Sequence, residues 1–156
     1  MRWRHAAVIA WCALGGWAQA DEVSVAVAAN FAGPMQKIAA SFAQDTGHTA
    51  VLSTGSTGKF YAQIKAGAPF EVFLAADQAT PRKLASEGWA VAAHQFTYAK
   101  GKLVLWSARP GMVDDHGAVL GQGGFEHLAM ANPKLAPYGV AALEVLTALK
   151  LMPALT

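Results

Sequence analysis

Three loops of the 156-residue chain carry residue types that could bind an anion. They span residues 28–31 (AANF), 53–59 (STGSTGK) and 132–139 (NPKLAPYG), and two of them place small or hydroxyl residues where a helix is expected to begin. The first N–H groups of a helix lack partners within it, and its dipole is positive at that end, so anions bind there readily. The pattern therefore allows an oxyanion site, whereas ordinary capping explains any one of these loops by itself.

The loop at 53–59 has only a partial likeness to a phosphate-binding P-loop. Gly58-Lys59 follows an expected strand, as a P-loop requires. The motif G-x-x-x-x-G-K-[ST] also needs glycine at position 53 and a hydroxyl residue at position 60, where the chain has Ser53 and Phe60. We therefore do not predict a nucleotide-binding site.

Catalytic and metal-binding patterns are weak. No G-x-S-x-G nucleophile motif occurs. The histidines at positions 48, 94, 116 and 127 lack metal-ligand spacing, and we interpret them as solvated or packed side chains. Asp77 is interpreted as a brace for its loop, and Asp114-Asp115 as a solvated turn. These patterns therefore give little support to an enzyme.

A regular alternation of strands and helices must position the three loops. Strands are predicted for residues 23–28, 49–53, 70–75, 102–107 and 128–131. Helices are predicted for 34–44, with Pro34 first, for 59–66, for a segment that Thr80 caps and Gly88 closes, and for 138–150. Such alternation predicts a mostly parallel sheet with helices on both faces. Ligands of these folds bind beyond the carboxyl ends of the strands, where the three loops are expected to lie.

Residues 1–20 have the pattern of a secretory signal peptide. Arg2 and Arg4 precede an apolar run over 6–17, and Ala18-Gln19-Ala20 follows it. The run is shorter than the ~20 apolar residues that span a membrane. We therefore predict export with cleavage after Ala20. Cleavage would remove the only cysteine and leave ten basic and ten acidic residues.

The composition excludes several classes of protein. The chain is 54% hydrophobic and 14% charged, which excludes intrinsic disorder. A formal charge of +2 is too small for an electrostatic nucleic-acid binder. A single cysteine excludes a disulfide framework and a thiolate zinc site.

The loops, taken in their order, resemble those of the periplasmic molybdate-binding proteins of ABC importers, which are type II periplasmic binding proteins. The matching stretches are residues 25–42, 53–78, 84–90 and 131–139, which extend over nearly all of the chain after residue 20. GAPFEVFLAADQ at 67–78 and the NP-x-x-x-PYG pattern at 132–139 are the more specific matches. Glu71 stands where the family usually has aspartate.

The resemblance implies an α/β architecture of two lobes joined by a hinge, lobe 1 at 21–101 and lobe 2 at 102–156. One molybdate or tungstate ion would bind between them through hydroxyl and backbone N–H groups, with no resident metal, no cofactor and no catalytic step. Carried over by position, the site falls on Ala29, Asn30, Ser56, Thr57 and Tyr138. The resemblance further implies a monomeric periplasmic receptor that serves an inner-membrane ABC permease and binds no nucleic acid.

Members of this family continue well beyond the position of Thr156. We therefore expect the architecture to be incomplete at the C-terminus, and residues 21–156 alone to bind molybdate weakly or not at all. The alternatives are a receptor for another tetrahedral oxyanion and a non-functional truncated relic. A secreted hydrolase with Ser56 as nucleophile has the least support, because it would also need a histidine base.

Overall fold

A three-stranded parallel sheet forms the centre of the computed structural model, which describes residues 21–152. The strands are β1 (Glu22–Ala28), β2 (Thr49–Gly55) and β3 (Val72–Leu74), in the order β2-β1-β3. Both neighbours pair with β1 in parallel. This confirms the predicted parallel sheet and its first three strands. The predicted signal peptide at 1–20 and its cleavage site lie outside the described residues.

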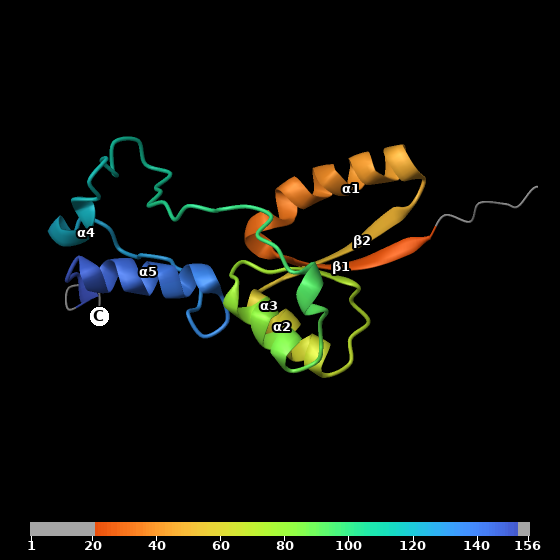
Figure 1. Ribbon diagram of the computed structural model, residues 1–156. Coiled ribbons are helices and arrows are strands. Elements are labelled where there is room, and N and C mark those ends of the chain that lie inside the picture. Colours follow the sequence, from red (N-terminus) through yellow and green to blue (C-terminus); the bar gives the residue numbers. More distant parts are fainter. Residues whose placement is uncertain (1–20, 153–156) are drawn as a thin grey trace, which may run out of the picture.

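The central strand is buried on both faces. The side chains at positions 25–28 are at most 2% exposed. Side chains alternate along a strand, and Val25 and Val27 pack with Met35 of helix α1 (Ala32–Thr46). The opposite face of the sheet is covered by α2 (Thr57–Lys65) and α3 (Ala79–Ser86), as Figure 1 shows. The two faces therefore bury β1 from Val25 to Ala28.

The helix ends differ in detail from the predicted ones. The 3-10 turn η1 (Ala29–Phe31) leads directly into α1, so Pro34 is not its first residue. Asp77, rather than Thr80, caps α3. Its Oδ1 accepts a hydrogen bond from the Thr80 N–H at 2.6 Å, and its Oδ2 accepts one from the Thr80 hydroxyl at 3.0 Å. The interpretation of Asp77 as a brace is confirmed.

Glu71 extends the pairing between β1 and β3. The Glu71 N–H donates to the Ser24 carbonyl at 2.9 Å, and the Ser24 N–H donates to Glu71 Oε2 at 2.8 Å. The carboxylate therefore replaces a backbone acceptor at the start of the short strand.

The second half of the described chain contains little regular structure apart from helices. The turn η2 (Ala92–His94) precedes a long extended stretch, and α4 (Val119–Gln122) and α5 (Pro137–Ala148) lie apart from the sheet (Figure 1). The strands predicted at 102–107 and 128–131 do not form. Neither segment has a ladder partner within residues 21–152, and Val104 and Trp106 are each 76% exposed. Across residues 21–152, no helix is both long enough and apolar enough to cross a membrane.

Candidate functional site

The carboxyl ends of the three strands bring two of the predicted loops together. Ala28 at the end of β1 lies beside Gly55 of β2, and Val27 lies beside Leu74 of β3. Neighbouring strands are about 4.8 Å apart, so the next residues of each chain segment emerge side by side. This edge of the sheet therefore brings η1, the start of α2 and the loop after β3 close together, as expected for this class of sheet.

Asn30 provides an amide group at this edge. It lies with Ala29 in η1, and both residues are exposed. The Asn30 amide carries two donor hydrogens. Asn30 also lines a cavity of about 1260 Å³, which Tyr138 lines as well. The structure thus brings together the first and third segments predicted for the site.

The hydroxyl groups of the second segment hold the loop in place. Ser56 caps α2 by accepting a hydrogen bond from the Lys59 N–H at 3.4 Å. The Thr57 side chain is 2% exposed, and its Oγ1 accepts from the Ala76 N–H at 3.0 Å. The N–H of Thr57, the first residue of α2, has no acceptor within the helix. The Thr57 N–H can therefore donate a hydrogen bond to a group outside the helix.

The third segment docks on the first turn of α2. The Gly58 N–H donates to the Leu135 carbonyl at 3.0 Å, and a Cβ on Gly58 would lie 3.1 Å from that oxygen. Tyr138 is the second residue of α5, after Pro137, and its hydroxyl lies against Gly101. The absence of a side chain at positions 58 and 101 therefore allows both close approaches.

Ser56 and Thr57 are not among the residues that line the cavity. Thr57 adjoins it through Ala76, which lines the cavity and donates to Thr57 Oγ1. Of the five predicted site residues, Asn30 and Tyr138 line a common space, whereas Ser56 and Thr57 do not line it. Ala29 precedes Asn30 in the same turn.

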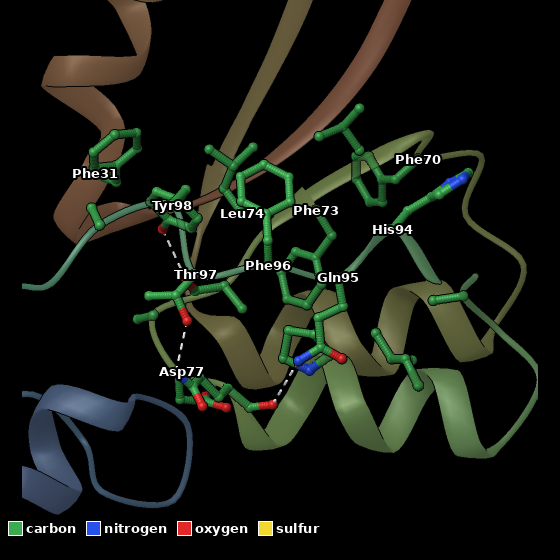
Figure 2. A pocket seen from close by; sticks show the side chains of 18 of the residues that line it. Phe31, Phe70, Phe73, Leu74, Asp77, His94, Gln95, Phe96, Thr97 and Tyr98 are labelled. Carbon is green, nitrogen blue, oxygen red and sulfur yellow. Dashed lines mark hydrogen bonds between the residues drawn. The ribbon is translucent and has the colours of Figure 1, made fainter. Parts of the chain in front are cut away.

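The cavity extends far beyond the predicted residues, and much of it is aromatic. Figure 2 shows Phe31, Phe70, Phe73 and Phe96 among its lining side chains. Phe70 meets Phe60 edge to face, with ring centroids 5.4 Å apart. Such a space is much larger than a tetrahedral oxyanion, and the predicted site residues Asn30 and Tyr138 line only part of it.

Residues 95–98 run along the cavity and are tied to the loop after β3. The Gln95 side chain donates to the Gln78 carbonyl at 3.4 Å, and the Gln78 side chain donates to the Thr97 hydroxyl at 2.7 Å. The Tyr98 hydroxyl donates to the Ala75 carbonyl at 2.9 Å. Sequence reasoning missed these residues, because no motif or periodicity distinguishes them.

The ionisable side chains that line the cavity are Glu71, Asp77, His94, Tyr98, Lys100 and Tyr138. Burial raises the pKa of Tyr98, and the nearby Tyr138 hydroxyl raises it further, so Tyr98 remains a neutral donor at physiological pH. Within residues 21–152, no three His, Cys, Asp or Glu side chains are grouped closely enough to hold a metal ion. The arrangement thus offers amide, hydroxyl and backbone N–H donors.

Comparisons with known proteins place these observations in a family. A family model described as bacterial extracellular solute-binding protein matches residues 23–156. The molybdate-binding protein ModA of Azotobacter vinelandii is 64% identical over 134 residues, and that of Rhodobacter capsulatus is 57% identical over 129 residues. The alignments cover 86% and 83% of this chain and 53% and 51% of those relatives. The chain thus spans about half the length of the curated relatives it matches.

A solved structure is similar as well. The Azotobacter vinelandii periplasmic molybdate-binding protein superimposes with a TM-score of 0.82 at 50% identity. The match covers 85% of this chain and 57% of that one.

Proposed function

Because the chain belongs to the family of bacterial extracellular solute-binding proteins, we propose that it is a receptor that captures molybdate, or tungstate, as an intact oxyanion. The α/β periplasmic-binding-protein fold is confirmed by the structural match. The observation that carries the proposal is the convergence of Asn30, the start of α2 and Tyr138 at one edge of the sheet. The names of the two similar ModA proteins identify the ligand class.

Neutral donors are the chemistry that such a receptor needs. The residues after position 20 carry equal numbers of basic and acidic side chains, so bulk attraction would not hold a dianion. Fixed dipoles would replace its water instead, and each hydrogen bond to a charged group contributes about 1.5–3 kcal/mol. The proposed donors are the Asn30 amide, the N–H groups of Ser56 and Thr57, and Tyr138, with Ala29 shaping the turn. No cofactor and no catalytic step are proposed.

Asp77 bears on which oxyanion would bind. Phosphate near neutral pH carries a proton and needs an acceptor for it. Asp77 lines the cavity and is held at the start of α3 by two hydrogen bonds from Thr80, and we propose that it does not serve as that acceptor. The site would therefore favour a fully deprotonated oxyanion, and the size of the closed site would separate molybdate from the smaller sulfate.

The proposal also names the compartment in which the protein acts and the partner that it serves. Export by residues 1–20 would deliver the protein to the periplasm, where it would act as a monomer and pass its ligand to an inner-membrane ABC permease. Lobes at 21–101 and 102–156 would close over the ion by a hinge motion, as in other periplasmic binding proteins.

An NMR titration of residues 21–156 with molybdate tests the proposal and detects even weak binding. We expect the amide signals of Asn30, Thr57 and Tyr138 to shift with molybdate, less with sulfate and least with phosphate. Asn30→Ala should weaken binding about tenfold or more, the equivalent of one lost charge-assisted bond. Gln36→Ala, a change of an exposed side chain on α1, is the matched control.

Other outcomes would contradict the proposal. A folded chain whose Asn30, Thr57 and Tyr138 signals ignore all three anions would show that residues 21–156 do not form an oxyanion site at this edge. A larger response to phosphate would favour a different oxyanion. Ester hydrolysis abolished by Ser56→Ala would point to a hydrolase, although the Ser56 hydroxyl is engaged with the Lys59 N–H.

A further inference from the structure

Tyr98 connects two of the loops that form the candidate site. Its ring packs on Phe31, with centroids 4.8 Å apart and planes tilted by 59°, and its hydroxyl donates to the Ala75 carbonyl at 2.9 Å. Figure 2 shows Tyr98 beside Phe31 among the side chains that line the cavity. Phe31 follows β1 and Ala75 follows β3, so one side chain spans the edge of the sheet.

The first contact is one residue away from a proposed donor, and the second is two steps away. Phe31 is the neighbour of Asn30 in η1. Ala75 precedes Ala76, whose N–H donates to Thr57 Oγ1 at 3.0 Å. The ring of Tyr98 therefore restrains the turn that carries Asn30, and its hydroxyl restrains the segment that holds Thr57.

Tyr98 also adjoins the third segment. It lines the same cavity as Tyr138. It lies three positions before Gly101, against which the Tyr138 hydroxyl rests. A change in the position of Tyr98 would therefore displace residues in all three segments of the candidate site.

The Tyr98 hydroxyl is not itself a free donor. A phenol has one O–H hydrogen, and that of Tyr98 points to the Ala75 carbonyl. Any influence of Tyr98 on an anion must therefore pass through the residues that it holds.

We infer that Tyr98 is a positioning residue of the oxyanion site, which fixes the Asn30 turn through its ring and the Thr57 segment through its hydroxyl. The inference rests on the proposed function for its effect on binding. Its effect on the geometry of the loops is independent of any ligand.

The first experiment compares Tyr98→Phe and Tyr98→Leu by titration of residues 21–156 with molybdate. Loss of one hydrogen bond predicts about fivefold weaker binding for Tyr98→Phe, since a neutral hydrogen bond contributes about 1 kcal/mol. Tyr98→Leu should bind more weakly still, because it also lacks the ring contact with Phe31. Tyr61→Phe is the matched control: it removes hydroxyl bonds to Glu87 between α2 and α3 and should leave affinity unchanged.

A second experiment needs no ligand. Amide hydrogen exchange of Phe31 and Ala76 is measured in the Tyr98→Phe and Tyr61→Phe variants, together with their urea unfolding. We expect faster local exchange at both amides in Tyr98→Phe only, beyond any change in global stability. Equal exchange in the two variants, or equal molybdate affinity for Tyr98→Phe and the parent chain, would overturn the inference. A parent chain that binds no oxyanion would refute the proposed function, and the exchange comparison would still decide the role of Tyr98.

Discussion

The segments 23–28 and 102–107 have the same predicted structure, a strand, and different observed structures. Both are short apolar runs with strand character, VSVAVA and KLVLWS. The first is the centre of the sheet, and Val27 in it is fully buried. The second has no ladder partner within residues 21–152, and Val104 in it is 76% exposed. An apolar pattern therefore produces a strand only where a neighbouring strand pairs with its backbone N–H and C=O groups.

The largest expected effect comes from placing the same charge in both segments. Val27→Asp would bury an unpaired carboxylate in the core, which costs several kcal/mol, about 3 or more, and should unfold the sheet. Val104→Asp should change stability by less than about 0.5 kcal/mol, as for other exposed positions. Urea unfolding followed by circular dichroism measures both. Equal effects would show that 102–107 is packed as tightly as β1.

Two glycines extend this comparison to side-chain packing, because part of the second half of the chain is closely packed. A Cβ on Gly139 would collide with the Ala131 carbonyl and lie 2.7 Å from the Pro133 nitrogen. Gly139→Ala should therefore cost about 1–3 kcal/mol. Gly33→Ala on α1 meets nothing within 4 Å and should stabilise the chain by up to about 1 kcal/mol. Thermal unfolding of both variants checks the opposite signs.

The smallest expected effect is on the acid side of the pH–stability curve. The Tyr61 hydroxyl, followed by Lys65, lowers the pKa of Glu87, and backbone N–H groups, Ala118 first, lower the pKa of Asp114. A carboxylate with a lowered pKa stabilises the fold above its unfolded-state pKa, near 4.5 and 3.8 here, and the stabilisation is lost as pH falls through the folded-state value.

Glu87→Gln, at the end of α3, and Asp114→Asn, in the segment before α4, should each reduce the loss of stability as pH falls. Unfolding midpoints between pH 7 and pH 3 measure the change. A parent chain and variants with the same slope would show that these carboxylates do not contribute. Glu126→Gln is the matched control, an exposed carboxylate.

Local pattern was sufficient for the first half of the fold. Alternating valines marked β1, and glycines marked helix ends, as Gly47 with φ of 76° shows. The same reasoning failed at 102–107, because period and composition do not reveal whether a neighbouring strand exists. Capping chemistry was nearly right at α3, where Asp77 rather than Thr80 supplies the acceptors.

The candidate site was predictable only in part. Asn30 and Tyr138 follow from resemblance, and the structure places both on one cavity. Tyr98 could not be found in this way, since its importance comes from a hydroxyl that reaches Ala75, far away in the chain. Contacts of this kind depend on tertiary structure and leave no local signal.

The hydrogen bond from Gly58 to Leu135 has a consequence for the order of folding. It joins segments that are distant along the chain, so forming it requires the closure of a long loop. We expect it to form after β1 and β2 have paired around α1, because those contacts join residues much closer in the sequence. We therefore expect the third segment to dock last in folding and to open first under mild denaturant, before the sheet melts. The anion-binding arrangement would then be assembled as the final step of folding.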